Sequence, residues 1–155
     1  MLGKITRWLR MLGHDVKYSN EMDDAKLTSV AKRDGRVLLT RDSELYKQAM
    51  ACEVDAFYLS GKTEEEKLAE LARRFKIKLH VDMKRSRCPK CNAKVKEISK
   101  REAEIRVEKG TFIQYSQFWE CPKCQQIYWQ GAHWKRIRKT LEMAKNISEK
   151  TQDTN

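Results

Sequence analysis

Apolar side chains recur at helical spacing in four stretches of the first 80 residues. The first of these places Ile5, Trp8 and Leu12 on one face and stops at Gly13, a residue that commonly ends helices. Thr63 and Glu66 form a capping box, which marks the start of the last one. The pattern predicts helices over residues 2–12, from Asp23 and Asp24 to Gly35, from Leu45 to about Ala51, and from Thr63 to Phe75.

Short apolar runs separate these helices. They predict strands at residues 16–18, 37–39 and 56–59. Strands that alternate with helices are typical of an α/β domain with a mostly parallel sheet, in which helices flank the sheet. We therefore expect residues 1–80 to form one such domain.

The pattern changes after residue 80. Residues 92–110 are highly charged and predict a loose or helical insertion, whereas residues 112–119 alternate between apolar and polar positions like a strand. A basic helix is predicted over residues 134–145, with a polar, disordered tail after it. These features predict a small second domain over residues 81–138 and a helix end with a tail over residues 139–155.

Four cysteines organise this second domain. Cys88 and Cys91 form one Cys-Pro-Lys-Cys sequence, and Cys121 and Cys124 form another. Two such pairs supply the four thiolates of a tetrahedral Zn²⁺ site, which would stabilise a module with too thin a core to fold alone. The spacing fits a zinc ribbon, in which each pair caps a β-hairpin. Two disulfides or a redox-active pair would use the same residue types, but no signal peptide accompanies the cysteines and the motif is duplicated.

The charge of the chain favours a polyanionic partner. The formal net charge is +11, and residues 81–155 carry 17 basic and 9 acidic side chains. RNA is the expected partner, since neutralised phosphates release counterions. A densely charged, solvated surface is the alternative. The residues expected to contact phosphates or to stack on bases are Lys84, Arg85, Arg87, Tyr128, Trp129, Trp134, Lys135, Arg136, Arg138 and Lys139, although the aromatic ones also suit the core of the ribbon.

Four acidic residues stand where a sheet edge meets helix starts. They are Asp23, Asp24, Asp42 and Glu44. Carboxylates that converge from separate elements can hold Mg²⁺ or Mn²⁺ for phosphodiester hydrolysis. Asp is also a favoured N-cap residue, and spacing alone favours that interpretation.

Several sequence motifs resemble the Mut-seven C-terminal RNAse domain family. They are Leu2-Gly3, Arg7-Trp8-Leu9-Arg10-Met11-Leu12-Gly13-His14-Asp15, Asp23-Asp24, Leu38-Leu39-Thr40-Arg41-Asp42, the two cysteine pairs, and Ile127-Tyr128-Trp129-Gln130-Gly131-Ala132-His133-Trp134. The resemblance implies a PIN-like nuclease fold with an appended zinc ribbon. It also implies catalytic roles for Asp24 and Asp42, beside Asp23 and Glu44. The family's opening strand, which normally ends in an acidic residue, has no counterpart in this sequence.

Three functions fit these observations. The first is a divalent-metal-dependent endoribonuclease whose ribbon binds the substrate. The second is a non-catalytic module that binds RNA or the ribosome, and the third is an adaptor whose aromatic ribbon docks another protein. The sequence shows no apolar run long enough to span a membrane, so we expect a cytoplasmic protein, and the oligomeric state is left open.

Overall fold

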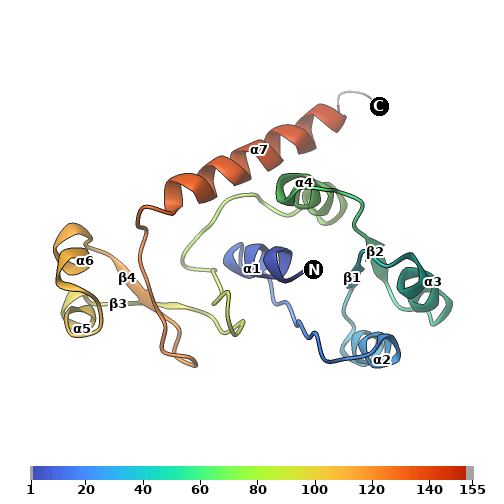
Figure 1. Ribbon diagram of the computed structural model, residues 1–155, viewed down its shortest axis with the longest axis horizontal. Coiled ribbons are helices and arrows are strands. Elements are labelled where there is room, and N and C mark those ends of the chain that lie inside the picture. The colour runs from blue at the N-terminus through green and yellow to red at the C-terminus, as the bar shows by residue number, and fades with distance from the viewer. Residues whose placement is uncertain (1, 153–155) are drawn as a thin grey trace.

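The computed structural model describes residues 2–152 and mixes helices with short strands. In chain order, the elements are α1 (Gly3–Met11), α2 (Asp24–Asp34), β1 (Leu38–Thr40), α3 (Ser43–Ala51), β2 (Ala56–Tyr58), α4 (Glu64–Phe75), β3 (Lys96–Ile98), α5 (Lys100–Glu104), α6 (Lys109–Gln114), β4 (Phe118–Glu120), β5 (Ile127–Tyr128) and α7 (Trp134–Gln152). Figure 1 shows the strands in two separate places, β1 and β2 on the right and β3 and β4 toward the left. No helix of the described part is long and apolar enough to cross a membrane.

The N-terminal part contains a parallel sheet, but a smaller one than predicted. Strands β1 and β2 are parallel, with Leu38 opposite Ala56 and Thr40 opposite Tyr58. Helices α2 and α3 pack beside them, and a small core of Ala31, Leu45, Ala49 and their neighbours closes that interface. Among the described residues, these two strands form the whole of the parallel sheet. The predicted mostly parallel sheet is therefore confirmed only for β1 and β2.

The prediction of a strand at residues 16–18 is wrong. The backbone of Val16 is instead bound by side chains, because Arg10 donates to its carbonyl oxygen at 2.8 and 3.1 Å and its amide donates to Asn92 Oδ1 at 3.1 Å. The backbone N–H and C=O groups of Val16 are thus satisfied by side chains and not by a partner strand.

The larger core lies between α1, α4 and α7. Ile5 and Leu9 from α1 meet Leu68 and Leu71 from α4, and Leu141 from α7 completes the cluster. Figure 1 shows α7 running along the top of the molecule and over α4. Helix α7 therefore packs against the N-terminal part although it follows β3, β4 and β5 in sequence.

Helix α7 continues well past residue 145, up to which it was predicted. It extends to Gln152, where a disordered tail was expected, and residues 153–155 of that tail lie outside the described residues. The continuation follows from the apolar stripe, because Ile147 lies one turn beyond the buried Ala144 and remains half-buried.

The second sheet lies within residues 81–138, the part for which a zinc ribbon was predicted and which we call the ribbon. Strands β3, β4 and β5 are antiparallel in that order, with Ile98 opposite Phe118 and Trp119 opposite Tyr128. The insertion at residues 92–110 forms β3, α5 and the start of α6, and Figure 1 shows both helices at the far end of the ribbon.

The predicted strand over residues 112–119 is correct only at its end. Residues up to Gln114 belong to α6, so the alternating side chains do not share a sheet face. Ile113 is 68 % exposed, and Phe112 lies under the Lys100 ammonium group at 4.7 Å. Since α6 ends just before β4, only three residues remain to pair with β3.

Candidate functional site

The two cysteine pairs adopt the same backbone turn. In the first turn, the Asn92 amide donates to the Cys88 carbonyl at 2.9 Å, and the Cys88 amide donates to the Ala93 carbonyl at 2.7 Å. In the second turn the equivalent bonds are 2.8 and 2.9 Å long. The residue after each second cysteine has a positive φ, 72° at Asn92 and 60° at Gln125. We call these turns knuckle 1 (residues 88–92) and knuckle 2 (residues 121–125).

The two knuckles bring four sulfur atoms together. The Sγ atoms of Cys88, Cys91, Cys121 and Cys124 all lie within 4.8 Å of one another. Cys88 Sγ is 3.6 Å from Cys124 Sγ, and Cys91 Sγ is 3.3 Å from Cys121 Sγ. Tetrahedral Zn²⁺ with Zn–S bonds of about 2.3 Å separates its sulfurs by about 3.8 Å, so the cluster has the dimensions of a zinc site.

All five cysteines are free thiols, so the described part of the chain contains no disulfide that would support the alternative interpretation. Sulfur is a ligand that Zn²⁺ prefers, and the donor set is complete with four thiolates. The four cysteines therefore form a site able to hold a zinc ion. Cys52, the fifth cysteine, is exposed at the end of α3 and lies outside this group.

Tyr128 shapes the electrostatics of this cluster. Its hydroxyl group is 3.0 Å from Cys88 Sγ. Burial raises the pKa of the Cys88 thiol, but hydrogen bonds from Tyr128 and from the amides of Cys91 and Lys90 outweigh that effect and hold the pKa at about 7. Burial, followed by the contact with Cys88, raises the pKa of Tyr128. Tyr128 is thus a hydrogen-bond partner of a cysteine, with its ring half-buried.

Knuckle 1 is also fastened to the N-terminal part. The buried guanidinium group of Arg10 donates to the carbonyl oxygens of Pro89 at 3.0 Å and Lys90 at 3.3 Å. Asn92 Nδ2 donates to Asp15 Oδ1 at 2.6 Å. Gly13, with φ of 97°, lies so close to Arg85 that an added Cβ would sit 3.1 Å from the Arg85 carbonyl oxygen. The end of α1 and the loop after it therefore contact the backbone that carries Cys88 and Cys91.

The predicted acidic residues lie at helix starts, where two of them act as N-caps. Asp23 Oδ1 accepts from the Lys26 amide at 2.8 Å, and Asp42 Oδ1 accepts from the amides of Glu44 at 2.8 Å and Leu45 at 3.2 Å. Glu44 is exposed and pairs with Lys47 at 3.0 Å, while Asp24 is exposed in the first turn of α2. Among the described residues, the cysteines are the group of three or more potential ligands close enough for one ion, and these acids do not belong to it.

The predicted RNA-contacting residues before knuckle 1 divide into two kinds. Lys84 and Arg85 are exposed, and their side chains make no hydrogen bond or ion pair to any described residue. Arg87 is half-buried and donates to the Asn92 carbonyl oxygen at 2.9 Å, which gives it a structural role in the turn.

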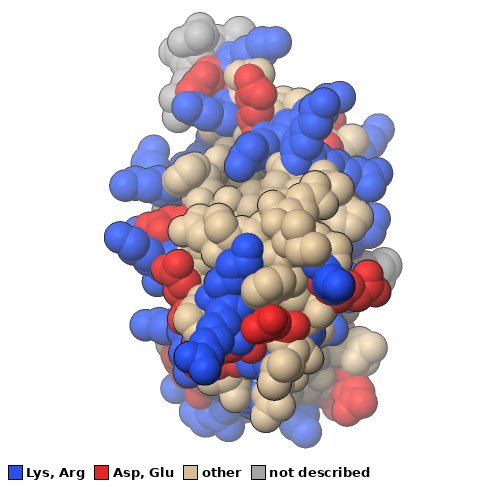
Figure 2. All heavy atoms as spheres, turned by 90° about the vertical axis from the view of Figure 1, so that its left-hand side faces the viewer, with Lys and Arg blue, Asp and Glu red and all other residues tan. Residues whose placement is uncertain are grey.

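The remaining predicted contacts lie in the ribbon and at the start of α7. Trp129 packs against Phe118 with ring centroids 6.3 Å apart, and Trp134 donates to the Trp129 carbonyl at 3.1 Å, so both indoles are half-buried. The predicted basic residues at the start of α7 are exposed; they are Lys135, Arg136, Arg138 and Lys139. Figure 2, which looks onto the ribbon end, shows an uncharged area bordered by many Lys and Arg side chains and fewer acidic ones.

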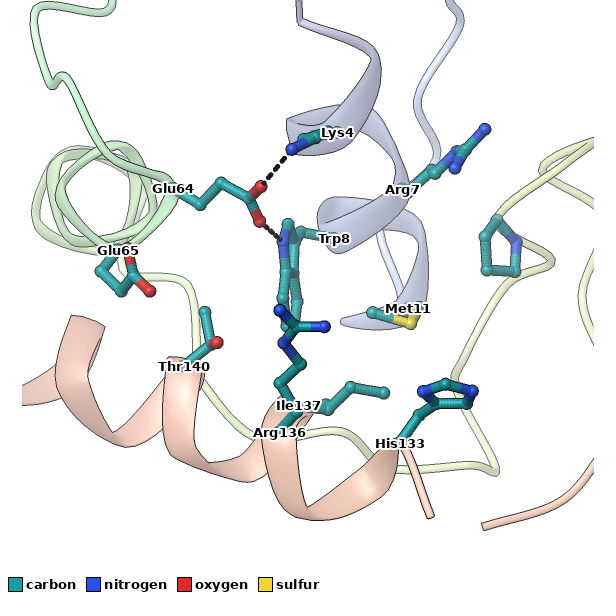
Figure 3. A pocket seen from close by; sticks show the side chains of 11 residues that line it. Lys4, Arg7, Trp8, Met11, Glu64, Glu65, His133, Arg136, Ile137 and Thr140 are labelled. Carbon is teal, nitrogen blue, oxygen red and sulfur yellow. Dashed lines mark hydrogen bonds and ion pairs between the residues drawn. The ribbon is translucent and has the colours of Figure 1, made fainter. Parts of the chain in front are cut away.

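Sequence patterns did not predict a groove of about 610 Å³ where three helices meet knuckle 1. Its lining comes from α1, α4, α7 and knuckle 1, and includes Arg7, Trp8, Met11, His133, Arg136 and Ile137. Figure 3 shows Trp8 held by Glu64, which also binds Lys4. The one sequence signal for it was the basic side of α1, at Lys4 and Arg7, which is typical of a solvated face as well.

Comparison with known proteins gives one match. The family model described as the Mut7-C RNAse domain matches residues 1–141. No curated protein and no solved structure matches the chain. The matched range includes the paired knuckles, the sheet edge at Asp42 and the beginning of α7. Because the model spans most of the sequence, the chain belongs to the Mut7-C RNAse domain family.

Proposed function

We propose that this protein binds RNA and cleaves it as a divalent-metal-dependent endoribonuclease, with a zinc-loaded ribbon that contributes to substrate binding. The observation that carries the proposal is the match to an RNAse domain family over residues 1–141. The net charge of +11 supports a phosphate-rich partner.

Asp24 and Asp42 are the proposed catalytic residues. A short turn at Gly35 joins α2 to β1, and the two elements pack together, so we infer that the first turn of α2 and the end of β1 lie at the same side of this unit. The carboxyl end of parallel strands is a common location of ligand sites. Asp23 and Glu44 are exposed beside them as supporting groups.

The side chains leave suitable oxygen atoms free. Asp42 uses Oδ1 for both of its amide contacts, and its Oδ2 makes no hydrogen bond to a described residue. Asp24 has a side chain without such a contact as well. Hard carboxylate oxygens of this kind suit Mg²⁺ or Mn²⁺, which would supply an activated water and neutralise charge on the phosphate. Asp24 and Asp42 would hold that ion and orient the scissile phosphate.

The zinc site has a structural role in this proposal. Four thiolates fill the coordination sphere of Zn²⁺, which leaves no open position for substrate. The ribbon would then present the basic residues of α7 and the exposed Lys84 and Arg85 to the RNA backbone.

A second function is a non-catalytic module that binds RNA or the ribosome. The capping contacts of Asp23 and Asp42 favour it, because they explain both residues without a metal. Cleavage separates the two functions.

The experiment measures cleavage of labelled single-stranded RNA by the zinc-loaded chain with Mg²⁺, Mn²⁺ or EDTA. Asp24→Asn and Asp42→Asn are the informative variants, because Asn also caps helices well and so removes the charge while it keeps the cap. Asp55→Asn is the matched control, because Asp55 is exposed and lies just before β2, at the end of the strand opposite to its carboxyl end. The nuclease proposal predicts cleavage that needs divalent metal, survives in the control and is lost in both variants.

Cleavage that persists in EDTA or in Asp42→Asn would exclude this site. RNA binding without cleavage under any metal would support the second function.

A further inference from the structure

We propose that the groove between α1, α4, α7 and knuckle 1 holds one unpaired nucleotide of an RNA strand, with Arg7 and Arg136 on its phosphates and its base over Trp8, Met11 and Ile137. The inference rests on the proposed RNA binding and names a site for it. The groove is lined by none of the proposed catalytic residues.

Two unpaired arginines provide the anion-binding side of the groove. Arg7 is exposed on α1 and Arg136 is exposed on α7, and neither makes a hydrogen bond or ion pair to any described residue. Lys4 differs, since Glu64 pairs with it at 3.2 Å. Arginine presents a planar donor fork that matches phosphate oxygens. Two arginine side chains without a hydrogen bond or ion pair to a described residue thus line the same groove from separate helices.

The acidic residues of the groove do not cancel these arginines. Glu64 is shared between Lys4 and the Trp8 indole, whose Nε1 donates to it at 2.7 Å. Glu65 has no such partner among the described residues, but Figure 3 shows it on the side of the groove opposite Arg7 and His133. We therefore expect the phosphates to lie toward Arg7 and Arg136, away from Glu65.

The floor of the groove suits a nucleobase. Trp8, Met11 and Ile137 are half-buried and line it from two helices. The bond to Glu64 fixes the orientation of the Trp8 ring, and aromatic faces accept any base by stacking. A groove of about 610 Å³ is within the range of about 300–1,000 Å³ found for small-ligand pockets. This size fits one splayed nucleotide and is too small for a duplex.

The position of the groove connects the two parts of the chain. Pro89 of knuckle 1 lines it, and Arg136 lies among the basic residues that α7 exposes. A strand that follows the basic surface of α7 would therefore reach α1 through this groove.

The test is fluorescence anisotropy of labelled oligouridine with the full zinc-loaded chain at several salt concentrations. The test variant carries both Arg7→Gln and Arg136→Gln. The matched control removes two positive charges outside the groove, with Lys76→Gln and Lys78→Gln just after the C-terminal end of α4. The slope of log affinity against log salt should fall by about 0.7 for each phosphate that the variant no longer neutralises, and should not change in the control. Arg7→Lys with Arg136→Lys should restore most of the slope.

A second measurement locates the base. Photocrosslinking with 4-thiouridine RNA, followed by peptide mass spectrometry, should place adducts in residues 3–11 and 133–141. Circular dichroism and zinc content show whether each variant is folded. The crosslinking uses the unaltered protein, so its result stands even if a variant fails to fold.

The outcomes separate the groove from the broader proposal. RNA binding with an unchanged salt slope in the arginine variant, or with crosslinks confined to other segments, overturns the groove and leaves RNA binding in place. No RNA binding by the unaltered chain overturns both.

Discussion

The side-chain amide of Asn92 donates a 2.6 Å hydrogen bond to the carboxylate of Asp15, 77 positions earlier in the chain. Asn92 Oδ1 accepts from the Val16 amide at the same time. Hydrogen bonds from Arg36 and from Asn92 lower the pKa of Asp15, so the acceptor is ionised at neutral pH. One residue of knuckle 1 thereby fixes the loop that follows α1, and the cysteine cluster is coupled to the N-terminal part.

This coupling sets how far unfolding should spread when zinc is removed. We expect chelation to unfold the ribbon and also to release the loop after α1, because Val16 and Arg87 donate their amides to Asn92 and Arg10 across the boundary. Hydrogen exchange should show fast exchange at both amides, whereas the Leu59 amide, bonded to Thr40 at 2.8 Å inside the parallel sheet, should stay protected. Retained protection at Val16 in the chelated protein would show that the loop holds without the knuckle.

Asn92 and Gln125 offer a matched pair of substitutions. Both occupy the same position of their knuckles with positive φ, but only the Asn92 side chain has hydrogen-bond partners among the described residues. Asn92→Gly should lower the free energy of unfolding by about 2 kcal/mol, since it leaves the Val16 amide and Asp15 without their bonds. Gln125→Gly should change it by less than about 0.5 kcal/mol. Denaturant unfolding of the zinc-loaded variants measures the difference, and equal losses would assign the effect to the turn alone.

Much of the fold could be predicted from local patterns. The apolar stripes predicted α1 to α4. The end of α2 at Gly35 and the start of α4 at Thr63 are confirmed, because a left-handed residue and a capping residue act on their neighbours in sequence. The four cysteines were found from spacing, which fixes the geometry of each knuckle.

The features that were missed depend on residues far apart in sequence. The segment at Val16 was predicted as a strand from its own residues. It is a loop because the side chains of Arg10 and Asn92, which are distant or outside the pattern, bind the backbone of Val16. The alternation at Phe112 resembled a strand although α6 exposes Ile113 to solvent. The groove is formed by three helices and a knuckle, so no single stretch of sequence contains its pattern.

The contact between Trp8 and Glu64 predicts a titration in the acid range. The hydrogen bond from the Trp8 indole lowers the pKa of Glu64. A carboxyl group with a lowered pKa contributes stability that is complete above its ordinary pKa, about 4.3, and is lost as the pH falls through the lower folded value. The indole proton resonance of Trp8 should therefore shift with a midpoint below that ordinary pKa.

Glu64→Gln is the control for this titration. The Trp8 resonance of that variant should not shift over the same range, and Trp8→Phe identifies the signal. A midpoint at or above the ordinary Glu value in the unaltered protein would contradict the hydrogen bond.

Substitutions in α7 test whether this C-terminal helix stabilises the N-terminal part. Leu141 is 5 % exposed and packs in the cluster with Ile5, Leu9 and Leu68, while Met143, two residues later, is 45 % exposed. Leu141→Ala should lower the free energy of unfolding by about 2–4 kcal/mol, because it removes buried methyl groups and leaves a cavity between α7 and α4. Met143→Ala should change it by less than about 0.5 kcal/mol. Thermal unfolding followed through the helical signal, with zinc content measured in parallel, checks both. The loss in Leu141→Ala should occur without loss of zinc, since the cysteines lie outside this cluster. A variant that releases zinc but keeps the stability of the N-terminal part would instead place α7 with the ribbon.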